Sequence, residues 1–347
     1  MGDGASSAKE ASKKDMFKYS APWPVYSLAF SRAKTKPFRL AAGSFIEEYK
    51  NKVQILDINE ETGDFEVHSQ VDHPYPTTKI QWIPDPEETR PELFATTGDY
   101  LRLWRVGEGE GGRNRTNLEV ILNNNKTSEF CAPLTSFDWH EVDPNFIVTS
   151  SIDTTCTVWN ITAEKAAGRA MGSVKSQLIA HDQEVYDVAY SNDVNIFTSV
   201  SADASVRMFD LRSLDHSTIV YEDEGNQPLL RLACNKQDPN YLAVVKIDDP
   251  SVVIIDIRMP CMSLAVLNAH SGACNGAVWA PHSAAHLITV SDDKRTLIWD
   301  ICNIPMRAPE PILCYEPDGP INQVQWSTVD TSWVGITWGS SIEVLKT

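Results

Sequence analysis

Two histidines in this chain are each followed, further along, by an aspartate that could pair with them. His181 precedes Asp203, and His270 precedes Asp293, which in turn precedes Trp299 by six positions. A histidine beside a carboxylate can act in general acid–base catalysis. When such a pair is buried within repeated strands, it more often forms a satisfied and rigid hydrogen-bond chain. Because both sets recur in the same sequence context, we predict that His181–Asp203 and His270–Asp293–Trp299 are structural.

Other patterns that could support catalysis or metal binding are weak. The sequence contains neither a Gly-x-x-x-x-Gly-Lys phosphate loop nor a Gly-x-Ser-x-Gly nucleophile turn. His282 and His286 are four residues apart, but they flank a predicted turn and no third ligand is implied. We therefore expect no catalytic residue, no cofactor and no metal, and the chain is not predicted to be an enzyme.

The histidine–aspartate sets must be positioned by the strands around them. A short strand-like pattern that ends in an aromatic residue, or once in Cys, recurs seven times. The copies end at positions 30, 82, 139, 190, 234, 279 and 326. Each is followed by a turn, a second strand, an Asp-containing turn, a third strand and a fourth strand. A period of about forty to fifty residues built from strands is typical of a β-propeller with one blade per repeat. The predicted fold is all-β, a seven-bladed propeller.

The two ends of the chain are expected to complete one blade. The last repeat supplies only three strands, over residues 321–326, 333–338 and 342–345, and residues 16–19 are the candidate for the missing outer strand. Sewing both termini into one blade removes the open edges of the ring. Residues 1–15 are small and polar and are predicted to be a disordered tail, and residues 16–347 a single propeller.

The composition narrows the classes of partner. The net charge is −17, and no cluster of Lys and Arg suits a phosphate backbone, so direct nucleic-acid binding is not expected. The seven cysteines include no Cys-x-x-Cys pair, which indicates free thiols in a reducing compartment. No apolar run resembles a secretory signal or a membrane span. We expect a protein of the cytoplasm and nucleus that binds neither membranes nor small-molecule substrates.

Segments between the fourth strand of one blade and the first strand of the next lie together on one edge of a propeller, here called the loop-rich rim. In this chain they are rich in aromatic residues and proline. Stiff loops with aromatic side chains make good partner contacts, although the same rings can instead cap the blades as core. The predicted partner-binding residues are Trp23, Tyr26, Tyr75, Phe130 and Tyr186.

The other edge, the opposite rim, carries a second pattern at the ends of two third strands. Phe209-Asp210-Leu-Arg212 and Ile255-Asp256-Ile-Arg258 share the form apolar residue, Asp, any residue, Arg. They resemble the Trp-Asp-x-Arg box by which WD-repeat receptors dock on the adaptor of cullin-four ubiquitin ligases. The predicted docking residues are Phe209, Asp210, Arg212, Asp256 and Arg258; the alternative is that these Asp–Arg pairs only brace the blade ends.

The aromatic-Asp strand endings, with an Ala-His before the next repeat, are marks of WD repeats. We expect repeats one, two and seven to lack this histidine and to be stabilised mainly by packing. Beyond the repeat, several longer strings carry a closer resemblance: Phe45-Ile-Glu-Glu-Tyr49, Asp72-His-Pro-Tyr-Pro-Thr-Thr-Lys79, Gln177-Leu-Ile-Ala-His-Asp182, Val206-Arg-Met-Phe-Asp-Leu-Arg212 and Asn235-Lys-Gln-Asp-Pro-Asn240. These strings resemble the Transparent Testa Glabra and anthocyanin-eleven group of WD-repeat proteins. That group includes the plant light-regulated WD proteins and the animal cullin-associated factor seven.

The resemblance implies a scaffold. Its plant members hold MYB and basic helix-loop-helix transcription factors together, and its animal members tether dual-specificity tyrosine-regulated and homeodomain-interacting protein kinases. We therefore expect a non-catalytic adaptor that assembles such regulatory proteins. The alternative is a substrate receptor of a cullin-four ubiquitin ligase, and both roles can coexist on one ring.

Overall fold

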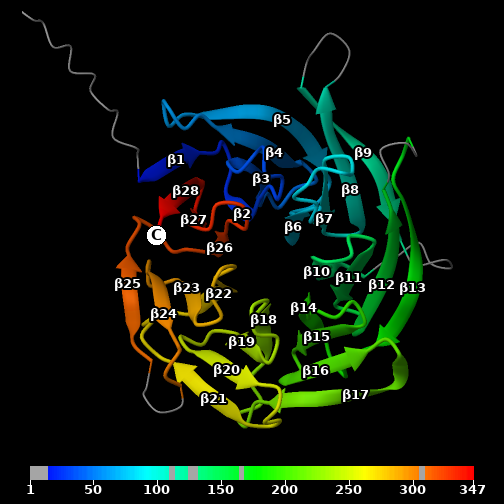
Figure 1. Cartoon of the computed structure of the whole chain (residues 1–347), viewed down its shortest axis with the longest axis vertical. Coiled ribbons are helices and arrows are strands. Elements are labelled where there is room, and N and C mark those ends of the chain that lie inside the picture. The colour runs from blue at the N-terminus through cyan, green and yellow to red at the C-terminus, as the bar shows by residue number, and fades with distance from the viewer. Residues whose placement is uncertain (1–14, 109–113, 124–131, 164–167, 305–308) are drawn as a thin grey trace, which may run out of the picture.

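The computed structural model describes residues 15–108, 114–123, 132–163, 168–304 and 309–347. Within these ranges the secondary structure consists of β-strands without helices, and the strands form seven separate four-stranded sheets. The sheets stand around a central axis like the blades of a propeller (Figure 1). The predicted all-β, seven-bladed propeller is confirmed.

Blades one to six are antiparallel sheets whose strands run in sequence order from the centre outwards. Blades one to three contain β2 (Val25–Phe30), β3 (Arg39–Ser44), β4 (Asn51–Ile58) and β5 (Phe65–His73); β6 (Lys79–Trp82), β7 (Leu93–Thr97), β8 (Leu101–Glu108) and β9 (Asn114–Leu122); and β10 (Leu134–Trp139), β11 (Phe146–Ser151), β12 (Thr155–Thr162) and β13 (Met171–Ile179).

The next three blades repeat this order. Blades four to six contain β14 (Val185–Tyr190), β15 (Ile196–Ser201), β16 (Ser205–Asp210) and β17 (Ser213–Glu222); β18 (Leu229–Cys234), β19 (Tyr241–Lys246), β20 (Val252–Asp256) and β21 (Ser263–Leu267); and β22 (Cys274–Trp279), β23 (His286–Ser291), β24 (Thr296–Asp300) and β25 (Pro311–Tyr315).

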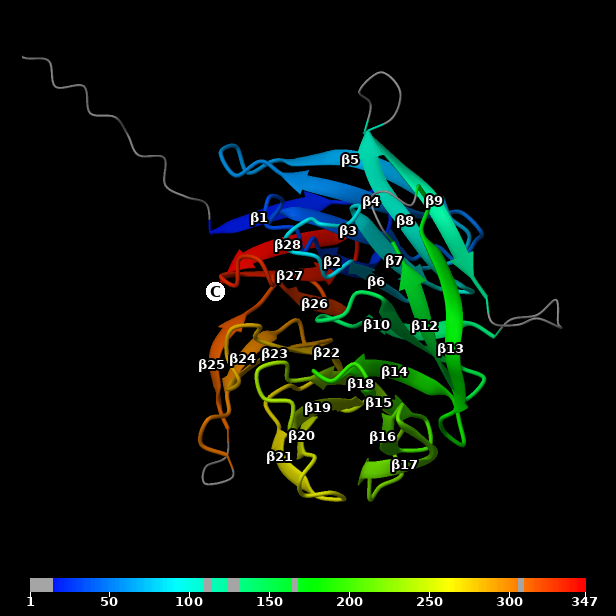
Figure 2. The same ribbon diagram turned by 45° about the vertical axis from the view of Figure 1, so that its right-hand side comes forward.

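Blade seven joins the two ends of the chain. It contains β26 (Gln323–Trp326), β27 (Trp333–Trp338) and β28 (Ser341–Lys346) from the C-terminal end and β1 (Met16–Ser20) from the N-terminal end. β1 pairs antiparallel with β28, with Phe17 opposite Val344. The buried ring of Phe17 stacks on Trp333 with centroids 5.0 Å apart. The predicted closure by an N-terminal strand is confirmed, and Figure 2 shows β1 beside β28.

The hydrophobic core lies between blades. One cluster joins Ile55 of blade one to Ile80 and Trp82 of blade two, and another joins Leu28 of blade one to Trp333 of blade seven. Burial of large apolar side chains at each seam contributes the main part of stability, at roughly 25 cal/mol per Å² of apolar surface removed from water. The ring is therefore a fixed frame that holds two loop-bearing rims apart.

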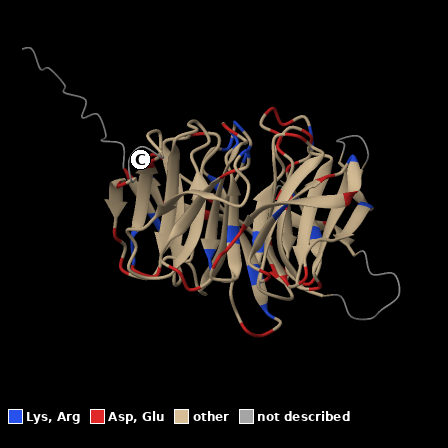
Figure 3. Ribbon diagram, turned by 90° about the horizontal axis from the view of Figure 1, so that it is seen from below, with Lys and Arg blue, Asp and Glu red and all other residues tan. Residues whose placement is uncertain are grey.

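The strand order assigns every turn to a rim. The first and third strands of each blade begin at the loop-rich rim. The third strands end at the opposite rim, and so does the C-terminus, which follows the third strand of blade seven. In Figure 3 the C-terminus is at the upper edge, so the lower edge is the loop-rich rim, and red acidic segments mark several of its loops. Within the described part of the chain, no helix has the length and hydropathy needed to cross a membrane.

Candidate protein-interaction surfaces

The first predicted hydrogen-bond chain lies in blade four. His181 Nε2 is 2.8 Å from Ser199 Oγ, and its Nδ1 is 2.9 Å from Asp203 Oδ2. Burial by itself would raise the pKa of Asp203, but hydrogen bonds from His181 and Ser205 outweigh burial and lower it. Phe209 takes the aromatic position and offers no N–H, so the chain stops at Ser199. The network fixes the turn between β15 and β16 at the loop-rich rim.

Blade six has the longer version of this chain. His270 Nε2 is 2.8 Å from Thr289 Oγ1, and Trp299 Nε1 donates to the same oxygen at 2.9 Å. His270 Nδ1 lies 3.1 Å from Asp293 Oδ2. Burial lowers the pKa of His270 despite its aspartate partner, which keeps the ring neutral near pH 7. The geometry matches a buried structural group with both ring nitrogens occupied.

A third histidine of this kind occurs in blade two. His73 Nε2 is 3.2 Å from Thr96 Oγ1, which also accepts from Trp104 Nε1 at 2.9 Å, and His73 Nδ1 lies 2.6 Å from the Tyr75 carbonyl oxygen. Burial is the main cause that lowers the pKa of His73 to about 4. The expectation that repeat two lacks its histidine is wrong, because His73 takes a backbone carbonyl in place of the usual turn aspartate.

The predicted contact residues of the loop-rich rim have different exposures. Trp23 is only 7% exposed and packs in the core shared by blades seven and one, so its prediction as a partner contact is wrong: its ring is already covered by the protein. Tyr26 and Tyr186 are half-buried at the starts of first strands, and Tyr75 is 39% exposed. Phe130 lies outside the described residues.

Sequence reasoning missed Phe45 and Tyr49, which among the described aromatic residues of this rim are the most exposed. Phe45 and Tyr49, in the turn between β3 and β4, are 44% and 74% exposed. Phe45 lies 5.4 Å from the Tyr26 ring, and Tyr49 meets Tyr75 edge-on at 5.1 Å, both between ring centroids. The one signal available in the sequence was the string over residues 45–49, which carried the family resemblance without being assigned a role.

The turn that carries these rings is organised by one buried side chain. Asn51 is fully buried, and its Oδ1 accepts from Ser44 Oγ and from the Ile46 amide, each at 2.8 Å. Its Nδ2 donates to the carbonyl oxygens of Ile46 and Glu48 at 2.8 and 3.0 Å. A side chain that replaces four hydrogen bonds of a turn holds that turn in one conformation. Phe45 and Tyr49 are thus presented to solvent from a fixed loop.

On the opposite rim, the structure pairs Arg212 with Asp210 in a bidentate contact. The guanidinium donates to both carboxylate oxygens at 2.8 and 2.7 Å, and Arg212 also lies 3.2 Å from Asp193. Hydrogen bonds from Arg212 lower the pKa of Asp210. The Arg212 side chain nevertheless stays 57% exposed. A planar fork held in this way is pre-oriented for a further contact.

Arg258 repeats this arrangement on the adjacent blade. It donates to Asp256 at 2.8 and 2.6 Å and to the Tyr241 hydroxyl at 3.3 Å, while its side chain is 56% exposed. The Asp256 side chain is nearly buried, and its pKa is lowered first by the hydrogen bond from Arg258. Both Asp–Arg pairs close turns of their own blades and do not link neighbouring blades.

The apolar position of the two boxes faces inwards. Phe209 is 7% exposed and packs on Phe197 with parallel rings 5.0 Å apart. Phe209 is therefore wrong as a direct docking contact, because its ring belongs to the blade core. The exposed apolar residues beside the arginines follow the boxes instead: Leu214 is 48% exposed, Met259 48% and Met262 59%.

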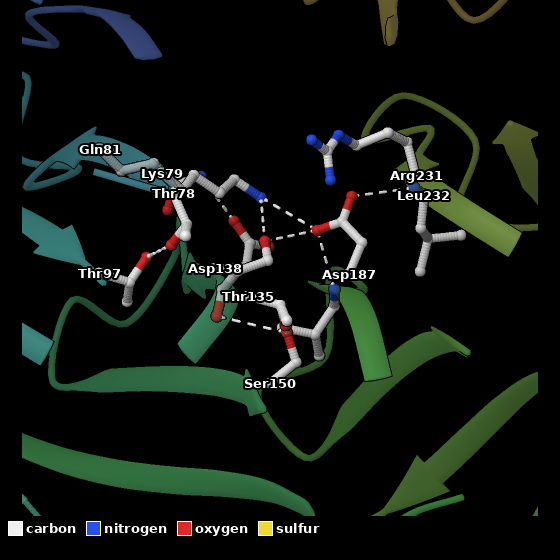
Figure 4. Close-up of polar contacts among 12 residues, drawn as sticks. Thr78, Lys79, Gln81, Thr97, Thr135, Asp138, Ser150, Asp187, Arg231 and Leu232 are labelled. Carbon is white, nitrogen blue, oxygen red and sulfur yellow. Dashed lines mark hydrogen bonds and ion pairs between the residues drawn. The ribbon is translucent and has the colours of Figure 1, made fainter. Parts of the chain in front are cut away.

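A central channel connects the two rims. Its cavity has a volume of about 540 Å³ and is lined by the inner strands of the ring. Figure 4 shows part of its wall, with Lys79 beside Asp138 and Asp187. Lys79 Nζ lies 3.1 Å from Ser136 Oγ and 3.5 Å from Asp187 Oδ1. The described residues contain no group of three or more His, Cys, Asp or Glu side chains placed to hold a metal ion.

The polar side chains of the channel tie consecutive inner strands together. A side chain on one inner strand accepts a hydrogen bond from a backbone amide of the next. The pairs are Gln81 with Trp139 at 2.9 Å, Asp138 with Tyr190 at 2.8 Å, Asp187 with Leu232 at 2.9 Å and, across the seam from blade seven to blade one, Gln323 with Leu28 at 3.1 Å.

The ionisation of Asp138 fits this bracing role. Burial by itself would raise its pKa, but Lys236, Lys79 and the hydrogen bond from Gln81 outweigh burial and lower it. Its oxygens accept from Gln81 Nε2 at 2.9 Å and from the Tyr190 amide, and Lys236 Nζ is 3.6 Å away. The ionised carboxylate of Asp138 therefore accepts hydrogen bonds from the inner strands of blades two and four and links them to its own blade.

The repeat and the whole chain both have known counterparts. The family model "WD domain, G-beta repeat" matches residues 172–210 and 261–300, which fall mainly on blades four and six. The "DDB1- and CUL4-associated factor 7 homolog" of Dictyostelium discoideum is 51% identical over 96% of this chain and 99% of its own length. An uncharacterized WD repeat-containing protein of Schizosaccharomyces pombe is 39% identical over 86% of this chain and 73% of its own length.

A WD repeat-containing protein of Saccharomyces cerevisiae is 34% identical over 85% of this chain, which spans 60% of that protein. With half of all aligned positions identical to the Dictyostelium protein across the complete ring, this chain belongs to the family of WD-repeat proteins that includes the DDB1- and CUL4-associated factor 7 homolog.

Proposed function

We propose that this protein is a non-catalytic substrate receptor of a cullin-four ubiquitin ligase. In this proposal the opposite rim docks on the adaptor of the ligase, and the loop-rich rim holds a protein client. The observation that carries the proposal is the pair of exposed, carboxylate-clamped arginines on adjacent blades of a chain with a relative named as a DDB1- and CUL4-associated factor. That name supports the receptor role more than the transcription-factor adaptor role.

The physical argument starts from the entropy of the arginines. A free arginine side chain loses up to about 2 kcal/mol of rotamer entropy when a partner fixes it. Arg212 and Arg258 are already fixed by bidentate pairs with Asp210 and Asp256, so much of this loss has occurred before binding. Arginine is enriched among the residues that dominate interface energies.

The surroundings of the arginines suit an interface. Leu214, Met259 and Met262 place exposed apolar atoms on the same rim. Interfaces combine such apolar contacts with a few oriented polar groups, and methionine adapts well to a partner surface. The proposal therefore assigns contact with the ligase adaptor to Arg212 and Arg258 together with these three apolar side chains.

The experiment is affinity purification of the tagged full-length chain from its own cells, followed by mass spectrometry. Subunits of a cullin-four ligase should co-purify with the unchanged chain and be lost from an Arg212→Ala, Arg258→Ala variant. A Phe45→Ala, Tyr49→Ala variant on the other rim is the matched control and should keep them. Undiminished recovery of ligase subunits with the arginine variant would contradict the proposed docking surface.

A second proposed role, as a scaffold for transcription factors or protein kinases, uses the loop-rich rim. The specific observation in its favour is that this rim has its own exposed aromatic side chains, Phe45, Tyr49 and Tyr75. They lie at the end of the strands opposite to the two arginines. In the same purification, kinases or transcription factors should vanish with the Phe45→Ala, Tyr49→Ala variant and persist with the arginine variant.

A further inference from the structure

The loop-rich rim brings together three exposed aromatic rings, one half-buried aromatic ring and two exposed acidic side chains at the junction of blades one and two. The rings are Tyr26, Phe45, Tyr49 and Tyr75, and the neighbouring acids are Glu47 and Glu48 of the same turn. We call these six residues the aromatic–acidic surface. Neither the family likeness nor the proposed ligase docking assigns it a ligand.

The rings form two contacting pairs on a fixed support. Phe45 and Tyr49 leave the two ends of a turn whose middle is held by Asn51, and Tyr26 and Tyr75 approach them from two neighbouring segments. When exposed aromatic side chains bind a partner, their solvent-accessible surface is buried and their conformational freedom decreases. Here the loop is already ordered, which reduces the conformational entropy lost on association.

The charges of this surface favour a cation. Glu47 is exposed and has no ion-pair partner among the described residues, and Glu48 pairs only with Lys50, where both side chains are at least 70% exposed. An ion pair so exposed to water is weak and easily exchanged for another. A Lys or Arg of a partner can therefore contact Glu47 or Glu48 while its charge lies over the face of Phe45 or Tyr49.

The rest of the rim strengthens this preference. Other turns on it carry exposed or half-buried acids, among them Asp182, Glu184, Glu224 and Asp248. Among described residues, the basic side chains in the turns of this rim are Lys50, Lys294 and Arg295. Summed over a surface, such an imbalance attracts positively charged partners and raises their association rate at low salt.

We propose that the aromatic–acidic surface binds an extended, Lys- or Arg-containing segment of a client protein that also carries an apolar residue. The cations would contact Glu47 and Glu48 and the aromatic faces, and the apolar residue would pack between the Phe45–Tyr26 and Tyr49–Tyr75 pairs. The surface is made by three separate stretches of chain, at residues 26, 45–49 and 75, and we assign an extended segment to it rather than a folded domain. This inference rests on the loop-rich rim being the client surface of the proposed function.

The test uses a phage-displayed library of random 16-residue peptides selected on the immobilised full-length chain. Enriched peptides should have net positive charge and at least one aromatic or large aliphatic residue. The best peptide, synthesised with a fluorescent label, should bind about tenfold or more weakly to a Phe45→Ala, Tyr49→Ala variant, a loss equivalent to about 1.4 kcal/mol. Binding should also weaken steeply as the salt concentration rises.

Charge reversal separates the electrostatic part from the aromatic part. A Glu47→Lys, Glu48→Lys variant should bind the labelled peptide about tenfold more weakly or worse, with the loss greatest at low salt. The matched control is Glu60→Lys, Glu61→Lys, which makes the same change in an exposed turn of the opposite rim and should bind within about twofold of the unchanged chain. Thermal midpoints of all variants show whether each is folded.

Several outcomes would overturn the inference. These are selection of neutral or acidic peptides, no enrichment on the folded chain, or binding that survives loss of Phe45 and Tyr49. The ligase proposal is judged separately, by recovery of ligase subunits with the Arg212→Ala, Arg258→Ala variant. Failure of peptide binding with arginine-dependent recovery refutes only the assignment of the client segment, whereas arginine-independent recovery refutes the docking proposal.

Discussion

The two rims of the ring differ in the kind of residue that each presents and in how that residue is held. On the loop-rich rim, a neutral buried amide, Asn51, holds a turn that exposes Phe45 and Tyr49. On the opposite rim, carboxylates at strand ends hold exposed guanidinium groups at Arg212 and Arg258. Asn51 fixes the backbone of its turn, and the carboxylates fix the neighbouring guanidinium groups. Both surfaces are therefore ordered before any partner binds.

This difference teaches how one frame can serve two partners. The same strands carry the two rims at their opposite ends, so a change in one turn leaves the other rim in place. The seams between blades, with apolar packing and the inner-strand hydrogen bonds, supply the stability on which both depend. The comparison therefore predicts that ring variants affect both rims and rim variants affect one.

The largest effect is expected from loss of the closing strand. Removal of residues 1–20 deletes β1, with the buried ring of Phe17 and the Lys18–Glu343 ion pair at 2.9 Å, and reopens the ring. Loss of a buried phenylalanine alone costs about 3–5 kcal/mol, so the thermal midpoint should fall steeply and both rims should lose their partners. Removal of residues 1–12 leaves β1 intact and is the control. Equal midpoints for the two truncations would refute the role of β1.

The next effect is a pH dependence that arises at the loop-rich rim. The pKa of His73 is about 4 in the folded chain, below the value near 6.5 of an unfolded histidine, so the folded state binds fewer protons in between. Its contribution is fully present above pH 6.5 and is lost as the pH falls towards 4, by about 3 kcal/mol. Urea titrations at pH 7 and pH 4 should show this loss.

A His73→Gln variant provides the comparison for that measurement. It removes the titrating group, so its decrease in unfolding free energy between pH 7 and pH 4 should be smaller than that of the unchanged chain by about 3 kcal/mol. The remaining decrease belongs to carboxylates whose pKa is lowered, such as Asp203 and Asp293. Identical pH profiles for the two proteins would contradict the assignment to His73.

A smaller effect is expected from Asn51→Ala. The substitution removes four hydrogen bonds that Asn51 makes to Ser44, Ile46 and Glu48 and should lower the unfolding free energy by about 2 kcal/mol. It should also weaken binding at the aromatic–acidic surface while leaving recovery of ligase subunits unchanged. Asn59→Ala is the control, because Asn59 closes an exposed turn on the opposite rim. A larger loss of stability for Asn59→Ala than for Asn51→Ala would break the comparison.

The smallest change in stability is expected from Arg212→Ala, Arg258→Ala. Both guanidinium groups are exposed, and their ion pairs lie within single blades, so the thermal midpoint should not change measurably. Among the rim variants, this one should have the largest effect on recovery of ligase subunits. A clear fall of the midpoint would instead indicate that the Asp–Arg pairs act mainly as braces.

Much of the fold could be predicted because strands repeat along the chain with a regular period. The seven inner strands, the Asp-containing turns and the closing strand at residues 16–19 follow from alternating apolar residues and turn chemistry, which are local properties. The histidine chains of blades four and six could also be predicted, because their residues match the pattern of WD repeats. His73 was missed because its second partner is the backbone carbonyl of Tyr75, which sequence does not mark.

The surfaces were less predictable, because exposure depends on what packs above a residue. Trp23 and Phe209 have the residue types of contacts, yet both rings are covered by the core. Phe45 and Tyr49 become exposed because Asn51 turns the chain outwards at that point. The sequence by itself determined the repeat, the number of blades and the Asp–Arg boxes. Only the tertiary structure decided which aromatic rings face solvent, because burial is set by contacts between blades that are distant in sequence.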